Sequence, residues 1–152
     1  MSKQAAKILS GNGIIYVPKN VKVKKSKTGF GLFAMEPLRR GDFVIEYTGK
    51  IIPTKVADEN PNRYLFEINK KWTIDGHTRK NIARYINCSC RPNCEPDIKK
   101  GRVLIFAKRV IKIGEELTCD YGEEYFNDYL KKPGCKCGFC DGTGKLLKKN
   151  NF

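Results

Sequence analysis

The sequence lacks a long hydrophobic run, which argues first against a membrane protein. No stretch of the 152 residues reaches the roughly 18 consecutive apolar residues that a membrane-spanning helix needs, because charged residues, glycine or proline interrupt every candidate. The N-terminus also lacks the continuous apolar segment of a secretory signal peptide. The sequence therefore predicts a soluble protein of a reducing compartment, with no membrane partner.

Histidine is scarce as well, and the cysteines cannot all pair. The single histidine, His77, leaves little for a catalytic metal site, which needs three ligands and an open position. Seven cysteines are an odd number, which argues against a disulfide framework in a chain without a signal peptide. The last three lie among glycines within residues 134–140, a pattern typical of structural zinc, and the cluster at 88–94 can supply the fourth thiolate. Free thiols are the alternative.

Acidic residues are missing from the two ends of the chain, whose net charge is +14. Residues 1–28 carry seven lysines and no acid, and residues 129–152 carry six lysines and one aspartate. Basic ends favour a polyanion such as nucleosomal DNA, and a solvated lysine-rich surface is the alternative. Residues 114–128 have the opposite charge, with six acids and no base, which suits a basic peptide. Solvated acids at helix ends or turns are the alternative.

Short alternating segments divided by turn residues predict a mainly β fold with short helices. The expected strands cover residues 14–17, 21–24, 43–47, 51–52, 64–68, 72–74, 103–107 and 116–119. The expected helices are short and cover residues 54–59 and 81–86.

The segment Gly29–Ala34 matches the dinucleotide-binding pattern G-x-G-x-x-A. That fingerprint requires a helix to open at the glycines, and Pro37 and Gly41 would break such a helix within two turns. The glycine pair then either lets the backbone approach a ligand closely or merely makes a turn, and taken alone it favours the turn.

Together with the terminal cysteines, four motifs in a fixed order resemble the SET-domain protein lysine methyltransferases. The matching segments are Gly29–Gly31 (G-x-G), Tyr47–Gly49 (Y-x-G), Arg84–Asn93 (R-F-I-N-H-S-C-x-P-N) and Glu116–Gly122 (E-L-T-x-D-Y-G). The resemblance implies several small curved β-sheets, a knot-like threading of the C-terminal segment and a post-SET zinc element. It divides the chain into a basic extension (1–13), a SET domain (14–128) and a post-SET cysteine cluster with a basic tail (129–152).

The resemblance also assigns roles to residues. It implies two catalytic tyrosines, Tyr121 and Tyr64, and a substrate channel formed by Cys119, Tyr125 and Phe126. It implies that S-adenosylmethionine contacts Gly29, Phe30, Gly31, Arg84, Tyr85, Asn87 and Cys88. The implied zinc ligands are Cys90, Cys135, Cys137 and Cys140, with Cys94 as the alternative to Cys90.

Two features depart from the usual family pattern. Cys88 replaces the usual histidine, and the terminal cysteines follow C-x-C-x₂-C rather than the commoner C-x-C-x₄-C. Cys119 occupies the position where the family carries a phenylalanine or tyrosine that controls the degree of methylation.

The function implied by the resemblance is S-adenosylmethionine-dependent N-methylation of a protein lysine, on a histone tail and beyond monomethylation. The implied location is the nucleus, or a host nucleus for a bacterial or viral protein, with the cytoplasm as alternative. The competing interpretation is a non-catalytic, zinc-stabilised basic module that binds nucleic acid or nucleosomes. A third interpretation is an inactive SET fold that binds peptides without modifying them.

Overall fold

A computed structural model describes residues 7–10 and 13–148 of the chain. Most of the expected N-terminal extension (1–13) and the last four residues of the basic tail lie outside the described residues. Within the described part of the chain, no helix is long and apolar enough to cross a membrane.

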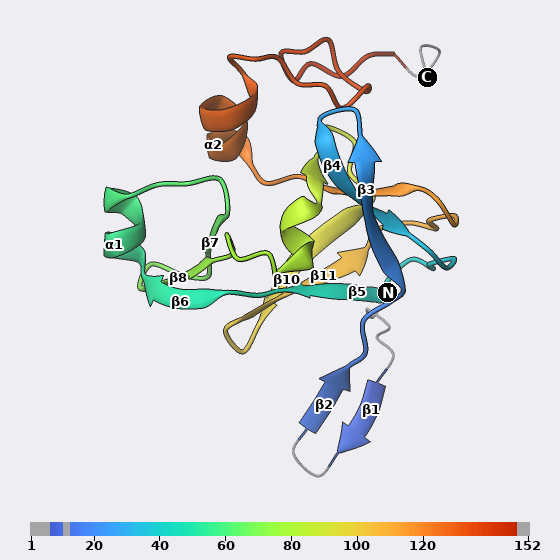
Figure 1. The fold of residues 1–152 in the computed structure, drawn as a ribbon, viewed down its shortest axis with the longest axis vertical. Coiled ribbons are helices and arrows are strands. Elements are labelled where there is room, and N and C mark those ends of the chain that lie inside the picture. The colour runs from blue at the N-terminus through green and yellow to red at the C-terminus, as the bar shows by residue number, and fades with distance from the viewer. Residues whose placement is uncertain (1–6, 11–12, 149–152) are drawn as a thin grey trace.

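Small sheets, rather than one large sheet, form the fold (Figure 1). One sheet has the order β3-β4-β12-β9, with β3 at Val21–Ser26, β4 at Gly29–Ala34, β12 at Glu116–Cys119 and β9 at Asn87–Cys88. A second has the order β10-β11-β5, with β10 at Cys94–Lys99, β11 at Arg102–Ala107 and β5 at Phe43–Tyr47. The predicted mainly β fold of small sheets is confirmed.

Two further sheets extend this framework. The third has the order β6-β8-β7, with β6 at Lys50–Pro53, β8 at Trp72–Asp75 and β7 at Leu65–Glu67. A hairpin near the N-terminus pairs β1 (Lys7–Ser10) with β2 (Gly13–Tyr16). Helix α1 (Thr54–Glu59) follows β6 directly, and Figure 1 shows it at one end of the molecule.

The core lies where the first two sheets meet. Leu32, Val44, Ile105 and Leu117 are fully or almost fully buried there. Burial of each such side chain is worth about 1.5–3 kcal/mol, so these residues stabilise the contact between the two sheets. Along the first part of β3, half-buried and exposed side chains alternate. This alternation is typical of a strand with one covered face, and it agrees with the strand predicted at residues 21–24.

Several local predictions hold and one is wrong. The strand at 43–47 and the helix at 54–59 have the predicted bounds, and the predicted helix at 81–86 is a 3₁₀ helix, η1, at Ile82–Tyr85. The preference for a turn at the glycine pair is wrong, because Gly29–Ala34 forms strand β4, which pairs with β3 along its length and with β12 at Leu32 and Phe33. Strand β10 was not predicted.

The C-terminal part of the chain is inserted between earlier elements. Strand β12 pairs antiparallel with β4 and parallel with β9, which places Thr118 beside Asn87 and Cys119 beside Cys88. After β12 the chain forms helix α2 (Glu123–Tyr125) and a π-helical turn, η2 (Phe126–Leu130), neither of which was predicted. Figure 1 shows the segment after η2 running past the tip of the β3–β4 hairpin.

Candidate active site

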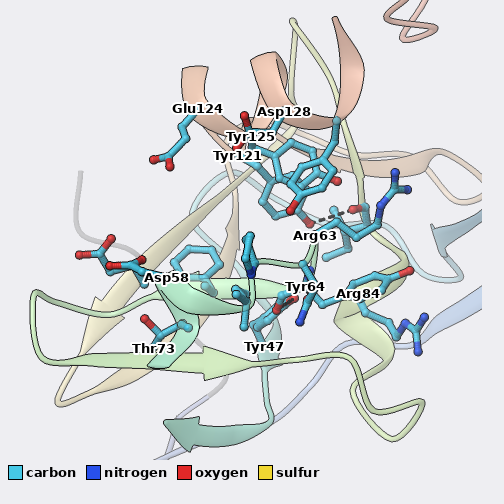
Figure 2. A pocket seen from close by; sticks show the side chains of 18 residues that line it. Tyr47, Asp58, Arg63, Tyr64, Thr73, Arg84, Tyr121, Glu124, Tyr125 and Asp128 are labelled. Atoms are coloured by element: carbon cyan, nitrogen blue, oxygen red, sulfur yellow. Dashed lines mark hydrogen bonds between the residues drawn. The ribbon is translucent and has the colours of Figure 1, made fainter. Parts of the chain in front are cut away.

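A cavity of about 350 Å³ lies between α1, β7 and the α2–η2 segment (Figure 2). Five tyrosines line it, and we call it the tyrosine pocket: Tyr47, Tyr64, Tyr121, Tyr125 and Tyr129. Aromatic walls with a few hydroxyl groups suit an extended alkyl chain that ends in a polar group.

Tyr121 follows β12 and is held in place by its own hydroxyl. The hydroxyl donates to the carbonyl of Ile86 at 2.8 Å, and the ring centroid lies 5.0 Å from that of Tyr125. Burial raises the pKa of Tyr121 well above its usual value. The hydroxyl is therefore neutral at physiological pH, a dipole rather than a base.

Tyr64 is held from two sides. The hydroxyl of Tyr47 donates to the carbonyl of Tyr64 at 2.7 Å, and the guanidinium of Arg84 lies 4.2 Å from the centre of the Tyr64 ring. Tyr47 is almost fully buried, and burial raises its pKa well above the usual value. Arg84 thus belongs to the tyrosine pocket, by stacking on one of its walls.

The α2–η2 segment supplies the other wall. Tyr125 and Tyr129 stack with ring centroids 5.1 Å apart, and the guanidinium of Arg63 lies 5.4 Å from the centre of the Tyr129 ring. Burial raises the pKa of Tyr125, while the positive charge of Arg63 opposes that shift. Arg63 therefore links the loop before β7 to the C-terminal segment.

A second cavity of about 340 Å³, the polar cavity, lies beside the first. It is lined by the turn at 26–28, by the segment 87–93 and by part of the cysteine-rich segment, including Cys135, Cys137 and Phe139. Asn87 organises this region, because its side-chain amide donates to the carbonyl of Phe30 at 2.9 Å and to Glu116 Oε1 at 2.7 Å.

The two glycines of the G-x-G motif are needed here for different reasons. Gly29 has φ of 117°, a conformation that side-chain-bearing residues rarely adopt. A Cβ at Gly31 would overlap the carboxylate of Glu116, which is the partner of Asn87. The motif therefore lets a strand approach the wall of the polar cavity closely.

Arg63 and Tyr125 line both cavities, so the tyrosine pocket and the polar cavity meet at these two side chains. Cys88 lines the polar cavity, and its sulfur accepts a hydrogen bond from the backbone of Tyr121. Burial raises the pKa of Cys88, so this residue is a neutral thiol. Two ligands, one in each cavity, could meet end to end at this junction.

The four cysteines assigned to zinc come together. The sulfur atoms of Cys90, Cys135, Cys137 and Cys140 all lie within 4.8 Å of one another. Cys90 and Cys135 have their sulfurs 3.9 Å apart, and those of Cys137 and Cys140 are 3.6 Å apart. A tetrahedral Zn²⁺ with Zn–S bonds of about 2.3 Å requires S···S separations close to these, so this donor set fits the metal. Cys94 lies outside the cluster.

The remaining assigned residues fall into three groups. Gly29, Phe30 and Gly31 lie on the strand that Asn87 contacts, and the Tyr85 ring meets the Phe30 ring edge-on at 6.2 Å. Cys119 is fully buried, lines neither cavity and remains a thiol because burial raises its pKa. Phe126 does not line the tyrosine pocket, and a Cβ at Gly144 would lie 3.1 Å from its Cζ atom.

Sequence reasoning missed several residues of the tyrosine pocket. Tyr47 was noted only as part of the Y-x-G motif, yet it forms a pocket wall and positions Tyr64. Arg63 and Tyr129 carry no motif. The signal for Tyr129 could have been its spacing of four residues from Tyr125 within one short helical segment, and nothing in the sequence points to Arg63.

The acidic stretch at 114–128 does not form one surface. Glu124 and Asp128 line the tyrosine pocket, whereas Glu115 and Glu116 line the polar cavity. Glu115 also pairs with Arg109 at 3.4 Å. Two acids from outside the stretch, Asp58 and Glu67, line the tyrosine pocket as well.

Several known proteins are similar to this chain in sequence. The family model described as SET domain matches residues 29–122. The chain is 42% identical over 121 residues to a Schizosaccharomyces pombe protein named histone-lysine N-methyltransferase, H3 lysine-4 specific, covering 71% of this chain and 13% of that protein. It is 41% identical over 117 residues to histone-lysine N-methyltransferase set1 of Dictyostelium discoideum, covering 68% of this chain and 8% of that protein.

A solved structure agrees with the fold. The humanized mutant of the Chaetomium thermophilum Polycomb Repressive Complex 2, bound to the inhibitor GSK126, has a TM-score of 0.63 and 36% identity, covering 70% of this chain and 15% of that chain. The chain spans only 8% and 13% of the two curated relatives above. The matched region includes the G-x-G strand, the segment around Asn87 and the strand that leads to Tyr121, so the chain belongs to the SET-domain family of protein lysine methyltransferases.

Proposed function

We propose that the chain is an S-adenosylmethionine-dependent protein lysine N-methyltransferase that modifies a histone tail. The observation that carries the proposal is the junction of two cavities at Tyr125 and Arg63, one lined by tyrosines and the other by Asn87, Cys88 and the cysteine-rich segment. A lysine side chain in the first cavity and the methyl donor in the second would meet there, as an in-line displacement requires.

The tyrosine pocket favours the reactive form of the lysine. A lysine ammonium has an ordinary pKa near 10.4 and must lose a proton before it can attack a methyl group. Tyr47, Tyr121 and Tyr125 have raised pKa values and remain neutral, so the pocket offers no anion to stabilise the ammonium at its inner end. Removal of water by the aromatic walls then favours the neutral amine.

Neutral hydroxyl groups also orient the amine. Tyr121 uses its proton on the Ile86 carbonyl, which leaves the lone pairs of its oxygen free to accept a hydrogen bond. Tyr47 directs its proton to the carbonyl of Tyr64 in the same way. Fixed oxygens that reach the amine without reorganising supply the electrostatic part of the catalysis.

The residues of the polar cavity fit S-adenosylmethionine, which when bound supplies an electrophilic methyl group on a sulfonium. Asn87 and Glu116 fix the wall beside the G-x-G strand. Lys27, Arg91 and Lys136 line the same cavity and can neutralise the carboxylate of the donor. Cys90, Cys135, Cys137 and Cys140 would hold a zinc ion in a structural role, because four thiolates would leave no open coordination position, and the ion would keep Cys137 and Phe139 at the cavity wall.

We further propose a chromatin substrate and action in the nucleus. Support comes from the names of the curated relatives and from exposed lysines on strand β3, Lys22, Lys24 and Lys25, which suit DNA phosphates. Activity on nucleosomes should then fall steeply with salt, while activity on a free histone tail should fall less. Equal salt dependence for both substrates would contradict the DNA contact.

We also propose that the enzyme adds more than one methyl group to the lysine. Cys119 is small and lies next to Tyr121, whose environment it influences. A Cys119→Tyr variant should stop at monomethyl-lysine, and because Cys119 is fully buried the larger ring should also cost about 1–3 kcal/mol of stability. Exhaustive reaction of the wild type that yields only monomethyl-lysine would contradict this part.

The test of the reaction is mass spectrometry of core histones and nucleosomes after incubation with S-adenosylmethionine. The wild type should add methyl groups, and a Tyr121→Phe variant should lose the activity while retaining zinc, fold and cofactor binding. Methylation that persists at the wild-type rate in this variant would remove Tyr121 from the mechanism. Absence of both methylation and cofactor binding would favour the non-catalytic zinc and nucleic-acid module, for which the basic side chains around the polar cavity provide a rationale.

A further inference from the structure

A buried asparagine, Asn81, lies outside the tyrosine pocket but is bonded to the backbone that supports it. Only 1% of its surface is exposed, and the side chains that line the pocket do not include it. Asn81 immediately precedes η1, where an asparagine ordinarily accepts a hydrogen bond from the first amides of the helix. Within the described residues its side chain makes no such capping bond. The fold therefore uses this amide for another purpose.

The side-chain amide of Asn81 joins two segments that are far apart in the sequence. Its Oδ1 accepts a hydrogen bond from the amide of Thr48 at 3.1 Å, and its Nδ2 donates to the carbonyl of Gly76 at 3.0 Å. A backbone N–H donates and a carbonyl accepts, so the side chain needs both a donor and an acceptor to satisfy the two partners. Thr48 directly follows Tyr47, which is a wall of the pocket.

Gly76 in turn contacts both neighbouring tyrosines. Its amide donates to the carbonyl of Tyr64 at 2.9 Å, and the same carbonyl accepts the hydroxyl of Tyr47 at 2.7 Å. A Cβ at Gly76 would overlap the Tyr47 ring and the amide of Asn81. The backbone at Gly76 thus packs directly against one pocket wall and holds the next by a hydrogen bond.

Together these contacts form a closed ring of bonds that passes through Tyr47, Thr48, Asn81, Gly76 and Tyr64. Each hydrogen bond tolerates a narrow range of distance and angle, so a displaced member of the ring moves the others. Tyr47 and Tyr64 are pocket walls (Figure 2), whereas Asn81 is the member whose side chain can be changed without altering a wall.

We propose that Asn81 is a positioning residue of the reaction, which sets the mutual orientation of Tyr47 and Tyr64 and thereby the alignment of the substrate amine. The inference rests on the proposed function, since it assigns the tyrosine pocket to the substrate lysine. A misplacement of about 1 Å at the reacting atoms slows a reaction as much as about a hundredfold. Because Asn81 lines neither cavity, its loss acts on the rate of the bound complex rather than on binding.

The experiment compares Asn81→Ala with Asp42→Ala in the full chain, with S-adenosylmethionine and a synthetic peptide of the histone H3 tail as substrates. Asp42 is a matched control, because it is also buried, its carboxylate accepts a hydrogen bond from the Arg39 amide at 2.8 Å, and it lines neither cavity. Both variants should lower Tm, by about 3–6 °C. Asn81→Ala alone should lower kcat, by about tenfold, while KM for the peptide and the cofactor affinity stay within about twofold of the wild type.

A double variant tests whether Asn81 acts through Tyr47. Tyr47→Phe removes another bond of the same ring, so kcat of the combined Tyr47→Phe and Asn81→Ala variant should stay close to that of the slower single variant. Independent effects would instead multiply, to about a hundredfold. If Asn81→Ala does not fold, Asn81→Asp replaces it in both comparisons, because its carboxylate has the same shape but cannot donate to Gly76.

Three results would overturn the proposal while leaving the methyltransferase function intact. They are a wild-type kcat in the Asn81 variant, an equal loss of kcat in Asp42→Ala, and losses that multiply in the double variant. If the wild type methylates neither this peptide nor core histones, the proposed function fails, and this inference fails with it.

Discussion

The tyrosine pocket and the polar cavity adjoin each other but are built in different ways. The pocket is made of aromatic rings held by neighbouring rings and backbone carbonyls, with Tyr121 bonded to Ile86 and Tyr47 bonded to Tyr64. The polar cavity is lined by charged, amide, hydroxyl and thiol side chains together with a few apolar ones such as Leu130 and Phe139, and one wall belongs to the segment that holds the cysteine cluster. The first site thus depends on the packed sheets, and the second depends in addition on a segment whose four cysteines are placed to hold a metal.

The largest expected effect follows from removing a zinc ligand. A Cys137→Ser variant should lose zinc and cofactor binding, because structural zinc contributes about 10 kcal/mol to ordering small cysteine-rich segments. The sheets that carry Tyr47 and Tyr64 should remain folded. Metal analysis, calorimetry with S-adenosylhomocysteine and circular dichroism would measure the three properties. A Cys94→Ala control, outside the cluster, should keep both zinc and cofactor, and a Cys137→Ser protein that still binds cofactor would contradict the distinction.

A smaller effect is expected from Gly31→Ala. The new Cβ would meet the Glu116 carboxylate, a flexible group that can move away but would then lose Asn87. Cofactor affinity should fall at least about tenfold, whereas stability should change by about 1 kcal/mol. A Gly114→Ala variant should lose stability but keep its cofactor affinity. The φ of 88° at this position strains an alanine, although the space around it is open. Cofactor titration and thermal melting of both variants would show whether the two effects separate.

Tyr47→Phe perturbs the other cavity. It removes one of two donors to the Tyr64 carbonyl, which keeps its hydrogen bond from the Gly76 amide at 2.9 Å, so the loss of one hydrogen bond costs about 0.5–1.5 kcal/mol. The kcat/KM for the lysine peptide should fall about tenfold or more, since a shift of one pocket wall disturbs the alignment of the amine. Cofactor affinity should not change. A weaker cofactor affinity in this variant would mean that the two cavities are not independent.

The smallest effect concerns pH. Burial raises the pKa of Tyr121 and Tyr47 above the usual value of 10.0, so both phenols stay neutral throughout the neutral and mildly basic range. The lysine amine, with an ordinary pKa near 10.4, becomes reactive as pH rises. Thus kcat/KM should increase with pH up to about pH 10, while the cofactor affinity stays nearly constant over the same range. A maximum below pH 9 caused by a tyrosine ionisation would contradict these pKa directions.

Local patterns in the sequence predict the parts of the fold that local chemistry determines. Phe43–Tyr47 is a buried apolar run between turn residues, and Thr54–Glu59 begins directly after a proline, so both elements have the predicted bounds. The cysteine assignments needed both the glycine-rich spacing and the resemblance, and the structure brings the four sulfurs together.

The missed elements depend on distant partners. Gly29–Ala34 is a strand because two other strands pair with it, which its two glycines alone do not favour. Strand β10 contains Pro96 and charged residues, and its partner β11 determines its conformation. Phe126 and Tyr129 lie three residues apart, and only the packing of the C-terminal segment directs Tyr129 into the pocket and Phe126 towards Gly144.

The most direct test of the account is a crystal structure with S-adenosylhomocysteine and a lysine peptide bound together. The account predicts the nucleoside in the polar cavity beside Asn87, and the lysine side chain among Tyr47, Tyr64 and Tyr121. The sulfur and the amine nitrogen should then face each other across the junction at Tyr125 and Arg63. A cofactor bound elsewhere, or a lysine outside the tyrosine pocket, would contradict the central claim that methyl transfer takes place where the two cavities meet.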